Sequence, residues 1–101
     1  MIRHIVILNF KKDDSVDYLD ILENTKPLIL KIPGVIKYDI YINESKYTPK
    51  NVTSFGVEII FKDKNALQVF MNDPKHYEAN KAFEKYLVEP GYMVLTHDYA
   101  V

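Results

Sequence analysis

Four stretches of the chain have the apolar patterning of β-strands. Ile2–Phe10 carries large apolar residues at both its odd and its even positions, and a strand of that kind is usually covered on both faces. It is therefore predicted to be a central strand. Val35–Asn43 and Ser54–Phe61 alternate between apolar and more polar positions, which is typical of strands with one solvent-facing side. Tyr92–Tyr99 is predicted to be the last strand, because it follows the helix-breaking pair Pro90-Gly91.

Between these strands, apolar residues recur at helical spacing. The segment Val16–Ile32 is predicted to be an amphipathic helix with a kink or a restart at Pro27, because proline removes one backbone hydrogen bond from a helix. Asp63 is a candidate N-cap for a short second helix. Asp73-Pro74 supplies another cap and a proline at the first helical position, and the apolar spacing extends this further helix to Leu87.

The order of the expected elements is strand, helix, strand, strand, helix, strand. This order is typical of the ferredoxin-like βαββαβ arrangement in the α+β class, a four-stranded antiparallel sheet with helices on one face. The uncovered sheet face would expose a larger apolar patch than monomers usually tolerate, and pairing of two sheets would bury it. We therefore expect a single domain over residues 1–101 that assembles as a homodimer.

Composition narrows the range of partners and cofactors. The chain has 101 residues, of which 48% are hydrophobic and 27% charged, with a formal charge of −1. A nearly neutral domain of this kind favours neither nucleic acid nor an anionic membrane as a partner. No apolar run is long enough to cross a bilayer and no signal peptide is recognisable, so we expect a cytoplasmic protein.

Metal and cofactor sites are not expected either. The chain has no cysteine, and its three histidines do not have metal-binding spacing on a helix. The three glycines are too scattered to form a phosphate-binding loop. We therefore expect no metal, no nucleotide and no other cofactor.

Four short segments resemble one known family. Arg3–Lys11 at the start, Ile32–Val35 after the first helix, Asp73–His76 at the second helix and Asp98-Tyr99 in the last strand are similar to the stress-responsive A/B barrel (Dabb) family. Each segment is short, but the four occur in the right order, and the resemblance extends over nearly the whole chain. The resemblance implies a dimeric α/β barrel, in which two ferredoxin-like units pair.

The resemblance also implies candidate site residues. One plant branch of the family includes a polyketide cyclase that closes a ring without metal or cofactor. Its general base, a histidine at the start of the second long helix, matches His76, and the aspartate that orients this base matches Asp98. Two tyrosines of that branch fall on Phe70 and Thr25, and the first histidine of the family's His-Pro-x-His segment is Asp73 here. Because Phe70 cannot donate a hydrogen bond, we do not expect cyclisation of that branch's substrates.

The chemistry of these residues leaves alternatives open. At the third helical position the helix dipole disfavours an imidazolium, so His76 is either a neutral base oriented by Asp98 or half of a pair that only stabilises the fold. His4 shares a strand face with apolar residues and is either a pocket-lining group or a core histidine. Tyr77 lies beside His76 and either lines the entrance of a pocket or packs on the surface.

Two functions follow from these residues. The first is a cofactor-free enzyme in which His76, helped by Asp98, removes a proton from a small apolar carbonyl compound held between sheet and helices, with His4, Phe70, Tyr77 and Thr25 lining the pocket. The second is a non-catalytic, stress-related binding or structural dimer. A weaker alternative, a cofactor-independent monooxygenase, rests on analogy of fold alone.

Overall fold

The structure, a computed structural model, describes residues 1–99 and has the expected order of strands and helices. The strands are antiparallel in the order β2-β3-β1-β4, which places β1 in the interior of the sheet. The ferredoxin-like α+β fold and the central first strand are thus confirmed. The elements are β1 (Ile2–Lys11), α1 (Tyr18–Leu30), β2 (Val35–Ile42), β3 (Val52–Phe61), α2 (Lys64–Asn72), α3 (Pro74–Lys81), the short 3-10 turn η1 (Glu84–Tyr86) and β4 (Leu87–Asp98).

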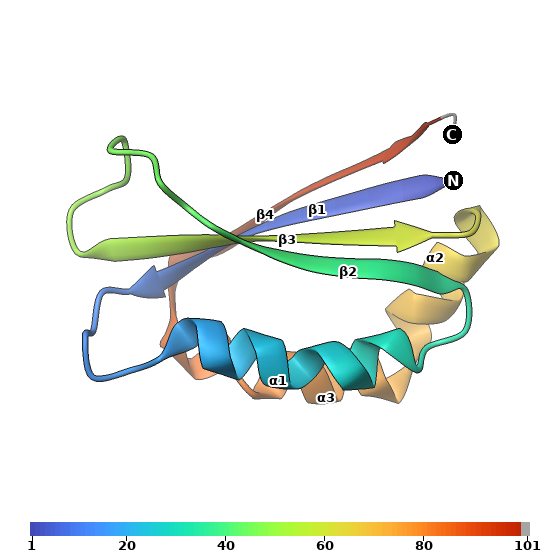
Figure 1. The fold of residues 1–101 in the computed structure, drawn as a ribbon, viewed down its shortest axis with the longest axis horizontal. Helices are drawn as coiled ribbons and strands as arrows, with labels where there is room; N and C mark the ends of the chain where they lie inside the picture. The colour runs from blue at the N-terminus through green and yellow to red at the C-terminus, as the bar shows by residue number, and fades with distance from the viewer. Residues whose placement is uncertain (100–101) are drawn as a thin grey trace.

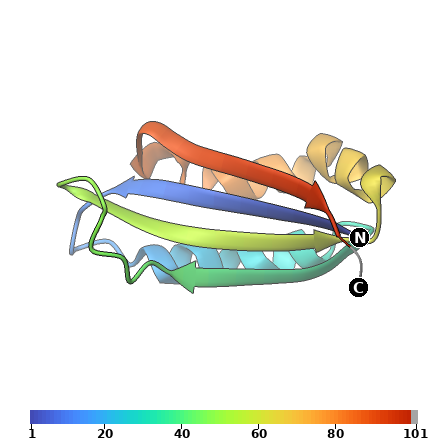
Figure 2. The same cartoon turned by 90° about the horizontal axis from the view of Figure 1, so that it is seen from above.

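The molecule has two layers. Helices α1 and α3 lie side by side under one face of the sheet, and α2 lies at the end of the sheet near the N-terminus (Figure 1). Seen from above, the sheet lies in front of the helices and its other face is open (Figure 2). Any pocket between sheet and helices must therefore form on the covered face.

Two aromatic clusters close the covered face at opposite ends of β1. At one end Phe10 is fully buried and stacks on Tyr18, with ring centroids 4.4 Å apart, while Phe55 and Phe83 meet it edge-on. At the other end the rings of His4, Phe61 and Phe70 meet edge-on. Edge-to-face aromatic pairs stabilise a core beyond the area that they bury, so both ends of the covered face are firmly packed.

The helix starts follow the expected capping residues. The carboxylate of Asp63 accepts a hydrogen bond from the backbone N–H of Ala66 at 2.8 Å, and that of Asp73 accepts one from Lys75 at the same distance. Helix α1, in contrast, runs through Pro27 without the expected restart. Pro27 and Glu23 are both exposed, so water can replace the helical partner that the carbonyl of Glu23 loses.

The last quarter of the chain differs from its apolar periodicity. Helix α3 ends at Lys81 instead of continuing to Leu87, and β4 begins at Leu87 instead of Tyr92. Long-range packing outweighs the helical spacing here, because the ring of Tyr86 packs edge-on against Tyr18 and Leu87 pairs with β1. Pro90-Gly91 falls within β4, at an irregularity in the β1–β4 register where a missing N–H is tolerated.

The open face of the sheet is apolar in its middle. A single row of cross-strand neighbours runs across it through Tyr41, Gly56, Ile7 and Met93. Tyr41 is 50% exposed, Ile7 38%, Met93 68% and the nearby Leu95 59%. In the described protomer these side chains lack the cover that apolar residues normally have in a stable fold.

Candidate functional site

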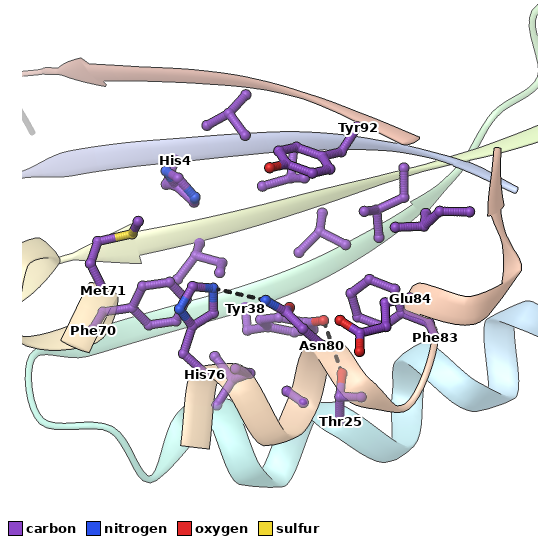
Figure 3. A pocket seen from close by; sticks show the side chains of 18 residues that line it. His4, Thr25, Tyr38, Phe70, Met71, His76, Asn80, Phe83, Glu84 and Tyr92 are labelled. Atoms are coloured by element: carbon purple, nitrogen blue, oxygen red, sulfur yellow. Dashed lines mark hydrogen bonds between the residues drawn. The ribbon is translucent and has the colours of Figure 1, made fainter. Parts of the chain in front are cut away.

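A cavity of about 530 Å³ lies between the sheet and the helices, and its wall includes Phe70 of one aromatic cluster and Phe83 of the other. Its wall is mostly apolar, and a few polar side chains from several elements reach it (Figure 3). This size and composition are typical of small-molecule sites. The polar side chains in the wall are His4, Thr25, Tyr38, His76, Asn80, Glu84 and Tyr92.

His76 lies in the cavity wall at the third position of α3. Its ring packs against Phe70, with centroids 4.2 Å apart, and its Nε2 lies 3.3 Å from the amide nitrogen of Asn80. Nδ1 is buried and has no hydrogen-bond partner among the described residues. Because an amide nitrogen only donates, Nε2 is the acceptor, and a neutral ring then carries its hydrogen on Nδ1.

Burial lowers the pKa of His76 below its ordinary value, while the nearby carboxylate of Asp73 acts in the opposite direction. The neutral imidazole expected from the sequence is therefore favoured. Its basic lone pair is on Nε2, held only by one long hydrogen bond from Asn80. A ligand proton donor that replaces this amide would meet a nitrogen able to accept a proton.

His4 faces the same cavity from β1. Its Nδ1 lies 2.8 Å from the hydroxyl of Thr96 on the neighbouring strand. Burial lowers the pKa of His4, and the positive charge that His76 carries when protonated lowers it further. His4 is thus both a pocket-lining residue and a histidine satisfied by one partner, and the two imidazoles are held neutral on either side of Phe70.

Asp98 does not reach His76. Its carboxylate lies 3.6 Å from the N-terminal amine of Met1, and Asp98 lies opposite Ile2 at the end of the sheet. Thr96, two residues earlier on the same face, occupies the position next to His4. Two residues along a strand span about 6.8 Å, which leaves Asp98 outside the cavity wall. The expected hydrogen bond that would orient His76 is therefore not formed.

Thr25 and Phe70, two candidate residues from the family resemblance, lie in the cavity wall. The hydroxyl of Thr25 donates to the backbone carbonyl of Leu22 at 2.7 Å and lies 3.2 Å from the hydroxyl of Tyr38. Burial raises the pKa of Tyr38.

Tyr77 packs beside His76, with ring centroids 5.2 Å apart, but its ring is half exposed and its hydroxyl donates to the backbone carbonyl of Met71. It packs outside the cavity wall.

Sequence reasoning missed Tyr38, Asn80, Glu84 and Tyr92 as wall residues. A signal for two of them was present, because Asn80 and Glu84 follow His76 at intervals of four, the spacing of one helix face. Tyr38 belongs to a strand in which apolar and polar residues alternate. This alternation shows on which face of the sheet Tyr38 lies, but not which helix residue it contacts. Its contact with Thr25 joins β2 to α1.

Two features of residues 1–99 concern metal ions and membrane-spanning helices. Residues 1–99 contain no cluster of three or more His, Asp or Glu side chains that could hold a metal ion. None of the helices in this range is long and apolar enough to span a membrane.

Comparison with known proteins agrees with the fold. Residues 2–101 match the family described as Stress responsive A/B Barrel Domain. A Dabb family protein from Mesorhizobium loti with a ferredoxin-like fold is 20% identical, with a TM-score of 0.71 over 99% of this chain and 97% of that one. A dimeric ferredoxin-like protein of unknown function from Thermobifida fusca is 18% identical, with a TM-score of 0.72 over 97% of this chain and 90% of that one.

A third solved structure is named as an oxygenase. A mutant form of SnoaB, a cofactor-independent oxygenase from Streptomyces nogalater, is 11% identical, with a TM-score of 0.71 over 97% of this chain and 92% of that one. At these identities the structural likenesses show the fold alone. No functionally curated protein matches the chain in sequence.

Proposed function

The chain belongs to the stress-responsive A/B barrel domain family, and we propose that it is a homodimer whose cavity binds a small, largely apolar carbonyl compound. In this proposal the Nε2 atom of His76 takes an acidic proton from the bound compound. Asp98 has no part in the step, because its carboxylate lies at the end of the sheet.

The observation that carries this proposal is the state of His76. A neutral imidazole lines a mostly apolar cavity, and its basic nitrogen is occupied only by an amide 3.3 Å away. Such a nitrogen is a suitable general base near neutral pH, since general bases work best when they are unprotonated at the working pH. The apolar wall favours a ligand that loses little solvation on entering it.

A second candidate function is binding without catalysis, and one observation favours it. When His76 accepts a proton, both of its nitrogens become donors, and Nδ1 has no acceptor among residues 1–99. A general base whose second nitrogen lacks an orienting carboxylate gains less stabilisation of its charged form. In that case the same cavity holds its ligand and releases it unchanged.

The homodimer is supported by the open sheet face. The row through Tyr41, Ile7 and Met93 is exposed in one protomer, and face-to-face contact with a second sheet would bury it. The protein from Thermobifida fusca with this fold is described as dimeric. In the proposed dimer the sheet faces pair on the side opposite to the cavity, so each protomer keeps its own site.

The test uses 2-tetralone, a neutral bicyclic ketone with an activated CH₂ group. We expect the protein to bind it and to accelerate exchange of its benzylic hydrogens for deuterium in D₂O, measured by NMR. The variant His76→Ala is expected to lose this acceleration, which for a positioned base is about a hundredfold or more. Glu78→Ala is the matched control, because Glu78 is an exposed residue of the same helix and does not line the cavity.

Each outcome separates the candidates. Binding without accelerated exchange favours the non-catalytic function, and binding with oxygen uptake in an oxygen electrode favours the monooxygenase. Exchange that is equally fast in His76→Ala contradicts the role of His76. If neither 2-tetralone nor related ketones bind the wild-type protein at millimolar concentration, the proposed function is wrong.

A further inference from the structure

The polar groups of the cavity wall differ in what they can offer a ligand. Within residues 1–99 the wall contains no lysine and no arginine, and Glu84 at its exposed margin is the only carboxylate. Burial lowers the pKa of both wall histidines, which favours their uncharged forms. The wall therefore has no permanent cation to offset the desolvation of an anion.

Tyr38 is the most deeply buried phenol in this wall, and the direction of its hydrogen bond can be assigned. The hydroxyl of Thr25 has one hydrogen, and it donates this hydrogen to the carbonyl of Leu22 at 2.7 Å. In the 3.2 Å contact between the two hydroxyls, Tyr38 must then be the donor and Thr25 the acceptor. The phenol hydrogen is thus engaged inside the protein, while the lone pairs of the Tyr38 oxygen remain available.

Two further acceptors come from the face of α3 and η1 that carries His76. Asn80 uses its amide nitrogen on His76, which leaves its carbonyl oxygen unused. The carboxylate of Glu84, which begins η1 four residues after Asn80, accepts hydrogen bonds but cannot donate when ionised. Figure 3 shows the side chains of Tyr38, Asn80 and Glu84 directed toward the same part of the cavity.

From this set of groups we propose that the cavity selects neutral ligands carrying a hydroxyl group that donates to the Tyr38 oxygen, the class of phenolic carbonyl compounds. This inference rests on the proposed function, since it specifies the ligand of the same cavity. A ligand hydroxyl satisfies an oxygen that already serves as a donor to Thr25. A ligand with only acceptors at that end leaves its own lone pairs facing those of Tyr38.

Carboxylates are excluded by the same wall. An anion entering the cavity loses its water without meeting a cation, and Glu84 at the margin repels it. A phenol carries the same kind of oxygen without the charge. The cavity therefore distinguishes a phenol from a benzoate of similar size.

The test measures dissociation constants of three para-substituted acetophenones by calorimetric titration at pH 6.5. We expect 4′-hydroxyacetophenone to bind about tenfold more tightly than 4′-methoxyacetophenone, as one additional hydrogen bond provides. We expect 4-acetylbenzoate to bind most weakly of the three. In Tyr38→Phe, which keeps the ring, the preference for the hydroxyl compound should fall to about one.

Two substitutions of Thr25 serve as matched controls. Thr25→Ser keeps the acceptor for the phenol hydrogen, and the preference for the hydroxyl compound should stay unchanged. Thr25→Val removes that acceptor, so the freed Tyr38 hydroxyl can donate and the methoxy compound should gain affinity relative to the hydroxyl compound. If Tyr38→Phe does not fold, the contrast between the two Thr25 variants decides the assignment.

The results separate a failure of this inference from a failure of the proposed function. Equal binding of the hydroxyl and methoxy compounds to the wild-type protein overturns this inference and leaves the proposed function standing. Tightest binding of 4-acetylbenzoate overturns the selection for neutral ligands. If none of the three compounds binds, and 2-tetralone does not bind either, the proposed function itself fails.

Discussion

The imidazole of His76 lies against the ring of Phe70, with centroids 4.2 Å apart and planes inclined by 32°. The same ring meets His4 edge-on at 6.1 Å. Phe70 is 2% exposed, so it separates both histidines from water on one side. Phe70 thus contributes an apolar part of the cavity wall and no hydrogen bond.

The first prediction concerns this wall. Replacing Phe70 with Leu removes part of the apolar cover of His76, and we expect its pKa to rise toward its ordinary value because burial is the main cause of the lowering. NMR titration of the imidazole Hε1 signal measures this pKa. Phe83→Leu is the control, since Phe83 lines the cavity but packs on Phe10. An equal rise in both variants would contradict the specific role of Phe70.

The second prediction is a loss of stability in mild acid. The pKa values of His4 and His76 are lower in the folded protein than in the unfolded chain, so the folded state favours their neutral forms. Their contribution is fully present above the unfolded value of about 6.5 and is lost as pH falls through it. Urea unfolding at pH 7.5, 6.5 and 5.5 should show a falling free energy of unfolding.

The variants that check this dependence are matched. The double variant His4→Asn and His76→Asn should have a flatter pH dependence between 7.5 and 5.5 than the wild type. His97→Asn should keep the wild-type slope, because this ring lies on the open face and contacts neither pocket imidazole. A double variant with the wild-type slope would show that other groups cause the loss.

The third prediction separates the charge of Asp73 from its capping. Asp73→Asn keeps a good N-cap but removes the negative charge that raises the pKa of His76, so this pKa should fall further. Asp73→Ala also loses the hydrogen bond to Lys75 and should cost about 1 kcal/mol of stability. Asp63→Asn is the control for charge, since Asp63 caps α2. If Asp63→Asn lowers the pKa of His76 as much as Asp73→Asn does, the charge of Asp73 has no specific effect on His76.

The fourth prediction is the oligomeric state. Light scattering at micromolar concentration should give a mass of twice 11.8 kDa, and the thermal midpoint should rise with protein concentration. Met93→Lys places a charge in the middle of the exposed apolar row and should shift the protein toward monomer. Leu30→Lys, at an exposed position on α1, should leave the dimer intact. A wild-type protein of 11.8 kDa would refute the dimer.

The sequence predicted the order of the elements along the chain and the helix caps, because these depend on local chemistry. Alternation along Val35–Asn43 and the carboxylates of Asp63 and Asp73 act within a few residues, and all three predictions are confirmed. The predicted end of α3 was wrong, because it depends on a contact between residues far apart in the sequence. Tyr86 has helical spacing, yet its contact with Tyr18 fixes it outside the helix, and no local pattern contains that contact.

The candidate site was predictable only in part. The strand face of His4 left a pocket position and a core position open, and the family resemblance singled out His76; both residues lie in the cavity wall. The pairing of Asp98 with His76 failed because it depends on the register of β4, which sets Thr96 beside His4. Tyr38 could not be predicted as a wall residue, because the sequence pattern does not show which helix residue faces β2.

The arrangement of the two aromatic clusters has a consequence for how this cavity can change. Because the rings around Phe10 and around Phe70 close the two ends of the covered face, the space between them is bounded mainly by aliphatic side chains such as Val6 on β1 and Val57 on β3. Exchanges among Val, Leu and Ile at such positions alter volume by single methyl groups and usually cost little stability. One scaffold can therefore accommodate ligands of graded size by mutation of its middle section, while its ends stay intact.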